Sequence, residues 1–138
     1  VGLPVLRKGG QEMSCNCNRD NRVVIKKEIT AGDTFSITYK HKQDGEIADM
    51  PEAYDLVIGL FDQNGARIAA YKYQDGDISN PETGVYKWTI SHEASVALPD
   101  LVVIKMTIYS ADLSFVQHCN QVVYVTVLRT EMNDELTT

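Results

Sequence analysis

The 138-residue chain lacks any long apolar run. A membrane-spanning helix needs roughly 20 consecutive apolar residues, and no stretch comes near that length. The apolar run at residues 1–6 is short and precedes the basic pair Arg7–Lys8, whereas a secretory signal peptide has the opposite order. The sequence therefore predicts a protein that does not enter a membrane and carries no export signal.

Cysteine is also scarce, with only Cys15, Cys17 and Cys119. An odd number fits poorly with a disulfide framework, which uses cysteines in pairs. A chain of this length can bury a core without disulfides or metals. We therefore expect one domain that folds in a reducing, cytosolic compartment.

Basic residues are fewer than acidic ones, and the net charge is −6. Residues 22–42 carry five basic and two acidic residues, whereas residues 43–138 carry five basic and fifteen acidic ones. An acidic body repels phosphate backbones, so nucleic-acid binding is not expected. The basic segment could pair with an acidic face of the same fold or of a neighbouring subunit, and scattered solvated lysines are an equal alternative.

Motifs of catalysis are missing as well. No Gly-x-Ser-x-Gly nucleophile elbow occurs, and the glycines stand singly at turns instead of forming a phosphate-binding loop. His41 continues the apolar face of its strand and His92 follows a strand end, and neither has a Ser or Cys partner at a recognisable spacing. We expect no catalytic residues and no cofactor, so the protein is predicted not to be an enzyme.

The most reactive side chains are those of Cys15, Cys17, His118 and Cys119. Thiolates and imidazole are zinc ligands, but a structural zinc site usually separates paired cysteines by two residues or more. His118 and Cys119 are adjacent in a strand-like run, so their side chains should point to opposite faces. The sequence therefore predicts no metal site, and an enzyme built on Cys119 and His118 is a minor alternative.

Two further patterns have an ordinary structural interpretation. The loop Asp75-Gly76-Asp77 offers oxygen ligands for Ca²⁺, but it lacks the regular spacing of a calcium loop and is better explained as a solvated turn. Trp88 and the seven tyrosines could form a platform for sugars. At alternating strand positions, however, aromatic side chains more often belong to the core.

What the chain does have is a dense series of strand patterns. Residues 34–41 alternate cleanly, with Phe35, Ile37 and Tyr39 on the same face, which is the pattern of a half-buried strand. Asn64–Gly65 predicts a tight hairpin, because both residues tolerate positive φ. A short helical turn is plausible only within residues 91–100. The predicted strands cover 22–29, 34–41, 55–61, 66–73, 84–90, 101–109 and 115–128.

About seven short strands with regularly spaced turns predict an all-β protein, an immunoglobulin-like antiparallel β-sandwich. No helical pattern alternates with the strands, which argues against a parallel α/β sheet. We expect three regions: an extended N-terminal arm at 1–21, the sandwich at 22–130 and an acidic, flexible tail at 131–138.

The first twelve residues have two interpretations. Val1 is the literal translation of a GUG codon, and residues 7–12 can be encoded almost entirely by purines, as a bacterial ribosome-binding site would be, so translation would start at Met13. If the segment is translated, it can add to the sheet edge of a neighbouring subunit. The candidate partner-binding residues are Val1, Leu3, Val5, Leu6, Arg22, Lys26 and Lys27.

The order of strand and turn residues from Gly32 to Leu128 resembles that of a known group of proteins. The residues that carry the resemblance are Gly32-Asp33-Thr34-Phe35, the run from Tyr54 to Gly65, Thr83-Gly84-Val85-Tyr86 with Ile90-Ser91, Met106-Thr107-Ile108-Tyr109-Ser110, Phe115-Val116-Gln117-His118 and Val123-Tyr124-Val125. This pattern is similar to that of the immunoglobulin-like modules of tailed-phage virion proteins, such as the N-terminal domain of the baseplate upper protein family.

The resemblance covers about two-thirds of the chain and implies a structural role. It implies an adaptor, connector or head-decoration subunit that docks on other virion proteins, forms a homo-oligomer and is assembled in the bacterial cytoplasm. The alternative from a different class is a carbohydrate-binding or adhesin-type module on a bacterial surface. That alternative requires an exposed row of aromatic side chains.

Overall fold

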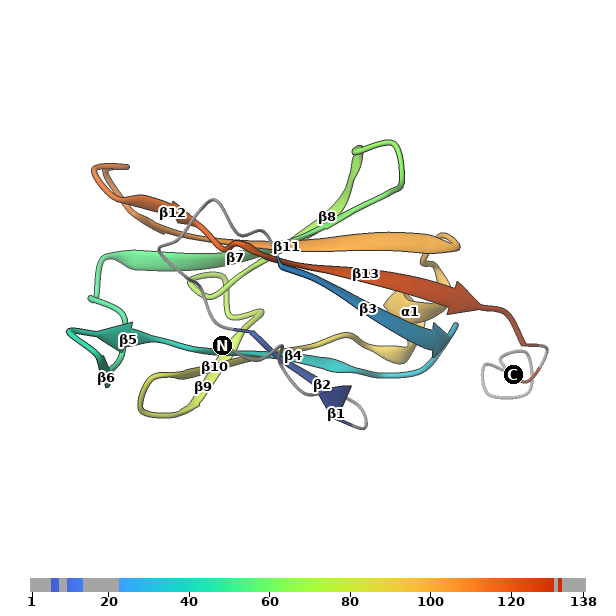
Figure 1. Ribbon diagram of the computed structural model, residues 1–138, viewed down its shortest axis with the longest axis horizontal. Coiled ribbons are helices and arrows are strands. Elements are labelled where there is room, and N and C mark those ends of the chain that lie inside the picture. The colour runs from blue at the N-terminus through green and yellow to red at the C-terminus, as the bar shows by residue number, and fades with distance from the viewer. Residues whose placement is uncertain (1–5, 8–9, 14–22, 131, 133–138) are drawn as a thin grey trace.

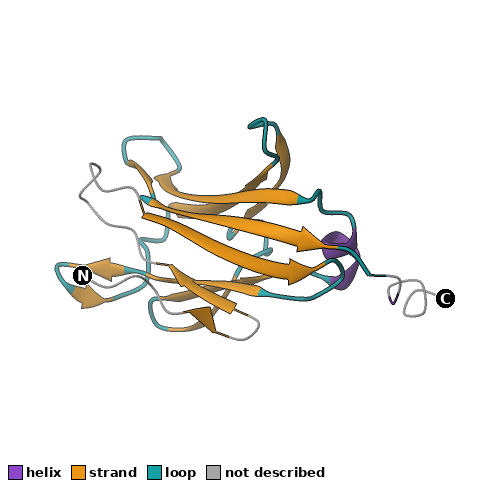
Figure 2. Cartoon of the chain, turned by 45° about the vertical axis from the view of Figure 1, so that its right-hand side comes forward, coloured by secondary structure: helices purple, strands orange, loops and turns teal. Residues whose placement is uncertain are grey.

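The protein is a sandwich of two β-sheets, described by a computed structural model for residues 6–7, 10–13, 23–130 and 132 (Figure 1). Strands make up most of these residues, and the two sheets lie in separate layers (Figure 2). The predicted all-β sandwich is thus confirmed. No helix in the described part of the chain is long and apolar enough to cross a membrane.

The smaller sheet has the strand order β1-β2-β4-β10-β9. Its central pair, β4 and β10, is antiparallel, and Ile37 lies opposite Trp88. The pairing of β2 with β4 is parallel. The bounds of its strands are Leu6–Arg7 for β1, Gly10–Met13 for β2, Ser36–Lys40 for β4, Val85–Thr89 for β10 and Ser79–Glu82 for β9.

The larger sheet has the order β3-β13-β11-β7-β8, and β12 pairs with one end of β11. β3 pairs with β13 in parallel, while the other pairs are antiparallel. Its strands are β3 (Val23–Thr30), β13 (Gln121–Leu128), β11 (Leu101–Ser110), β7 (Tyr54–Phe61), β8 (Arg67–Lys72) and β12 (Val116–His118). A separate small hairpin joins β5 (Lys42–Gln43) and β6 (Glu46–Ile47).

The core lies between the two sheets and follows the alternation predicted from the sequence. Phe35, Ile37 and Tyr39 are buried, and so are Tyr86, Trp88 and Ile90 on the neighbouring strand. Phe35 meets Trp88 edge to face, with ring centroids 5.9 Å apart. Aromatic side chains thus fill the space between the two sheets. Burial there removes their large apolar area from water, which stabilises the fold.

All seven predicted strands are present, and short strands are added at the edges. Each sheet combines strands from distant parts of the chain, in the orders β4-β10-β9 and β13-β11-β7-β8. The two parallel pairs were not predicted, because the direction of an edge strand depends on tertiary contacts that the local pattern does not show.

The helix α1 (His92–Val96) lies within residues 91–100, where a short helical turn was predicted. Ser91 accepts a hydrogen bond from the backbone N–H of Ala94, which satisfies one of the donors that a helix start leaves open. His92 bonds the Gly32 carbonyl through Nδ1, over 2.8 Å. The helix therefore connects the β3–β4 turn to the segment between β10 and β11, which links the two sheets.

The predicted hairpin at Asn64–Gly65 joins β7 and β8, but its turn differs from the expected one. Only Gly65 has positive φ, at 85°. The Gly65 N–H bonds the Asp62 carbonyl, and the Asp62 N–H bonds the Ala66 carbonyl. This is a three-residue loop, a type I turn followed by one left-handed residue. A separate register shift follows between Phe61 and Leu60, where the pairing moves from Arg67 to Ala69.

Candidate functional site

A groove lies on the outer face of the larger sheet, and we name it the outer groove. Leu56, Ile58 and Leu60 of β7 point into the core, so Val57, Gly59 and Phe61 lie on the opposite face. The groove has a volume of about 620 Å³. It is lined from β7, β8, β11 and the β12–β13 connection, and in Figure 1 the β8 and β12 hairpins rise on this side of the sheet.

Small residues make room for the groove. Gly59 and Ala70 pair with each other across β7 and β8, and neither has a long side chain that would fill the groove. A Cβ atom on Gly59 would lie 2.8 Å from Cε1 of Phe61, which means that the Phe61 ring covers this glycine. Glycine in a strand often marks such a close approach.

The groove has basic and neutral polar side chains at its rim. Arg67 is exposed at the start of β8, and Lys105 Nζ lies 5.2 Å from the centroid of the Phe61 ring. That distance is within the range of a cation–π contact. His118 and Asn120 complete this side, and the described residues that line the groove include no Asp or Glu. In a chain of net charge −6, this is a local reversal of sign.

The second feature is the end of the β11–β12 hairpin, which we name the β12 tip and define as residues 110–116. Three apolar side chains are exposed there: Leu113 by 65%, Phe115 by 37% and Val116 by 41%. Phe115 stacks on Tyr54 with centroids 5.3 Å apart. A cluster of exposed apolar side chains at the end of a hairpin is typical of a contact surface.

A hydrogen-bond network holds the β12 tip in shape. Oδ1 of Asp112 accepts bonds from the Ser110 hydroxyl, the Ser114 N–H and the Ser114 hydroxyl, over 2.8, 3.0 and 2.7 Å. The Ser110 N–H bonds the Phe115 carbonyl and closes the loop. These bonds from Ser114 and then Ser110 lower the pKa of the Asp112 carboxyl from 3.8 to about 2, so the group is an anion at neutral pH.

Leu113 stands in the left-handed region, with φ at 60°. A bulky side chain there is unusual and costs roughly 1–2 kcal/mol relative to an ordinary conformation. The turn would accept glycine at this position, as the β7–β8 turn does. A strained residue that is also the most exposed large apolar side chain of the described chain suggests a functional cause.

The candidate metal ligands named from the sequence do not form a common site in the described residues. Cys15 and Cys17 lie outside them. His118 is exposed and its Nδ1 lies 2.8 Å from the Thr107 hydroxyl, whereas Cys119 is buried with the core cluster. No group of three or more His, Cys, Asp or Glu residues in the part of the chain that is described could hold a metal ion.

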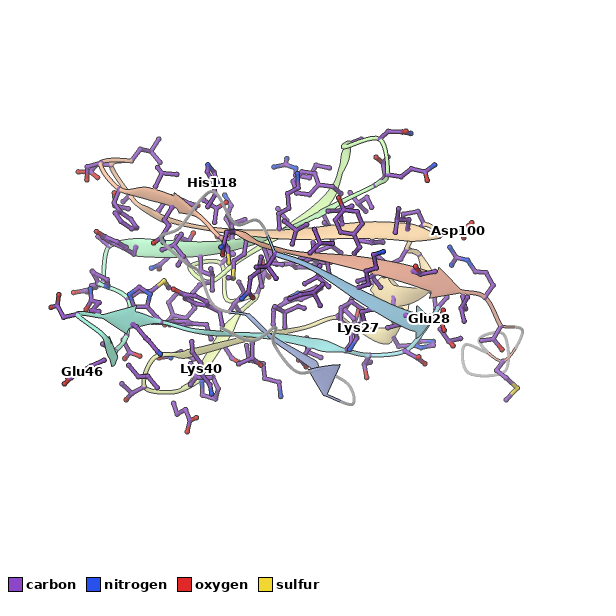
Figure 3. The ribbon with its side chains drawn as sticks, viewed as in Figure 1. Lys27, Glu28, Lys40, Glu46, Asp100 and His118 are labelled. Atoms are coloured by element: carbon purple, nitrogen blue, oxygen red, sulfur yellow. The ribbon has the colours of Figure 1, made fainter. Side chains whose placement is uncertain are left out.

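The predicted partner-binding residues have varied positions. Val1, Leu3, Val5 and Arg22 lie outside the described residues, and Leu6 belongs to β1. Lys26 is exposed on β3, at the edge of the larger sheet. Lys27 faces the other way, 5.9 Å from the centroid of Phe35, and burial lowers the pKa of its amine (Figure 3). Lys26 is therefore the better placed of the two to meet a partner.

The other polar residues singled out in the sequence have structural partners. His41 is buried at the end of its strand with Nδ1 2.8 Å from the Tyr39 hydroxyl, and burial lowers its pKa while Asp49 opposes the shift. Asp77 accepts a bond from the backbone N–H of Lys72, in an exposed turn. These residues close turns and cover the core.

Sequence reasoning missed both the outer groove and the β12 tip. The run Ser110-Ala111-Asp112-Leu113-Ser114 reads as an ordinary turn, and nothing in it predicts that the leucine takes the left-handed position. Gly59 was a usable signal, since a lone glycine inside an apolar strand indicates a bulge or a close approach. The basic rim could not be foreseen, because Arg67 and Lys105 are far apart in sequence.

Comparison with known proteins adds one result. No family model matches the chain, and no curated protein matches it. Among solved structures, the fold is similar to the "N-terminal domain of phage TP901-1 ORF48", with a TM-score of 0.49 and 11% sequence identity over 86% of this chain and 98% of that one. A phage domain is thus among the structures that the chain resembles, as the strand pattern predicted. The likeness is one of chain path, so the role of the protein is argued from its own surfaces.

Proposed function

We propose that the protein is a structural subunit of a phage virion that acts by docking to other virion proteins. The observation that carries the proposal is the β12 tip, where a rigid turn presents Leu113, Phe115 and Val116 to solvent. Exposed apolar anchors on a stiff support are what a docking module needs, because little conformational freedom is lost on binding. The sequence resemblance to phage virion modules supports the same role.

The site chemistry supports docking over catalysis. Among the described residues, no group with a shifted pKa lines the outer groove: His41 and Tyr86 both interact with Asp49, and Asp112 lies at the β12 tip. Catalytic sites gather such groups in a cleft. The outer groove instead combines an apolar floor with two cations, which is a surface for binding.

The edge strand β3 provides a second, weaker docking surface. Val24 is 42% exposed beside Lys26 on the outer face, and no strand of the described chain pairs with its free edge. An exposed edge accepts an additional strand through backbone hydrogen bonds. We infer that this edge, with Lys26, meets an acidic neighbour.

Mass spectrometry of virions purified from the producing strain tests the role directly. We expect peptides of this protein in stoichiometric amounts with other structural proteins, and electron microscopy should place its density against them. Absence of the protein from purified virions, with its presence in the lysate, would contradict the proposal.

The outer groove also favours a second candidate function, a carbohydrate-binding module. Phe61 with Lys105, Arg67 and Asn120 could meet a sugar ring and its hydroxyl groups. A glycan array decides this: binding that is lost in Phe61→Ala, with the fold intact by circular dichroism, would favour the surface module over the virion subunit.

A further inference from the structure

Two surfaces of the larger sheet are complementary in shape. The β12 tip is convex and carries Leu113 at its most exposed point, while the outer groove is concave because Gly59 and Ala70 on its floor have no long side chains. The tip is also preshaped by the bonds to Asp112 Oδ1. A protruding leucine on a stiff loop and an apolar hollow are the two halves of a typical hot spot.

The two surfaces are also complementary in charge. Asp112 next to Leu113 is an anion at neutral pH, and the hydrogen bonds that it accepts from Ser110 and Ser114 all end on Oδ1. The groove presents Arg67 and Lys105, and its described lining has no carboxylate. A carboxylate that enters the groove with Leu113 therefore meets cations, and Asp112–Arg67 is the expected pair.

The tip cannot reach the groove of its own molecule. His118 belongs to the groove wall, and the pairs Thr107–His118 and Tyr109–Val116 hold the hairpin in register between wall and tip. The strands would have to separate before Leu113 could fold back over the wall. The occupant that fits the groove is the same tip on another molecule.

We propose that the outer groove is the docking site for the β12 tip of a second copy of this chain, with Leu113 inserted over Ala70 and Asp112 beside Arg67. Tip and groove lie on one sheet, so a twofold axis between them brings each tip to the groove of the other copy. Both contacts then form in one closed dimer, in which each residue pair occurs twice.

The proposal deepens the docking role proposed above, and its test is independent of that role. Sedimentation equilibrium of the full chain should show a monomer–dimer equilibrium that saturates at the mass of two chains. Leu113→Gly should weaken association by roughly tenfold or more, since a central anchor is lost while the turn keeps its shape. Leu128→Ala, which trims a 45% exposed leucine at the far end of the outer face, is the matched control and should leave the dimer unchanged.

The groove is tested from the other side. Ala70→Trp places a large side chain in the groove, and Arg67→Glu reverses the charge of an exposed rim residue. Arg67→Glu keeps the test valid if Ala70→Trp folds poorly. Both should be monomeric where the wild type is dimeric, whereas Lys87→Glu, on an exposed position of the smaller sheet, should behave as the wild type.

Mixing two defective variants separates tip-to-groove contact from its rivals. Leu113→Gly keeps its groove and Ala70→Trp keeps its tip, so an equimolar mixture should regain dimers, with one contact in place of two. A dimer that persists in both groove variants would show tip-to-tip packing and overturn the proposal. A wild-type protein that stays monomeric, or that binds a saccharide in the groove as a monomer, would overturn it as well. The presence of the protein in virions does not depend on any of these results.

Discussion

The β7–β8 and β11–β12 hairpins belong to the same sheet and reverse the chain in nearly the same way. In both, an N–H of the left-handed residue bonds the carbonyl three residues earlier, from Gly65 to Asp62 and from Leu113 to Ser110. In both, an aspartate side chain accepts backbone N–H groups of the turn. The β11–β12 loop has one more residue, Ser114, before the strand resumes.

The difference lies in the residue at the left-handed position. Gly65 adopts it without a steric penalty, and a Cβ there would meet nothing within 4 Å. Leu113 adopts it at a cost and exposes most of its side chain. One turn is optimised for folding, while the other accepts strain to present an apolar group, which is expected where a surface binds a partner.

The largest effect should come from making the first hairpin like the second. Gly65→Leu places a leucine at φ 85°, farther from the left-handed minimum near 57° than Leu113 is at 60°. We expect a loss of about 1–2 kcal/mol in the free energy of unfolding, measured by urea denaturation. The corresponding fall in Tm is roughly 4–8 °C.

Gly65→Asn is the matched control, because asparagine tolerates the left-handed region. It should lie much closer to the wild type than Gly65→Leu. Since no atom lies near the position, equal losses in the two variants would point away from backbone strain and contradict the comparison.

The reverse exchange should stabilise the protein. Leu113→Gly relieves the left-handed strain, and the greater freedom of glycine in the unfolded chain offsets part of the gain. We expect an increase of ~0.5–1 kcal/mol in the free energy of unfolding, measured at a concentration where the chain is monomeric. A loss of stability would mean that Leu113 packs within its own molecule, and the functional explanation of its strain would fail.

The third prediction uses acid, with Asp112→Asn as the comparison, to isolate the contribution of the Asp112 carboxylate to the β12 tip. The folded-state pKa of Asp112, about 2, is below the ordinary 3.8, so its contribution to stability is present above pH 3.8 and is lost as the pH falls towards 2. Asp112→Asn keeps a hydrogen-bond acceptor that does not titrate. We expect the Tm of the wild type to fall more between pH 4 and pH 2 than that of the variant, by a small margin because the carboxylate is exposed. Parallel curves for the two proteins would be the contrary result.

Much of this architecture could be predicted from the sequence, and the hairpins show where prediction stops. Alternation places Phe35, Ile37 and Trp88 in the core because the side chains of a strand point to opposite faces in turn. The direction of β3 and the position of the outer groove depend on which strands become neighbours, and local patterns do not contain that information. The strain at Leu113 was hidden for another reason: leucine has no propensity for the conformation that it adopts.

The smallest effect concerns Asn64, where the sequence and the structure give different expectations. A two-residue turn would need positive φ at both Asn64 and Gly65, so that Asn64→Ala would cost about as much as Gly65→Ala, roughly 1 kcal/mol. In the structure only Gly65 has positive φ, and Asn64 contributes its backbone N–H to Asp62 Oδ1, which alanine would retain. We therefore expect Asn64→Ala to change the free energy of unfolding by less than about 0.5 kcal/mol, and Gly65→Ala to show the full loss. Urea denaturation of the two variants measures the two changes in the free energy of unfolding. Equal losses would support the two-residue turn and contradict the similarity between the two hairpins.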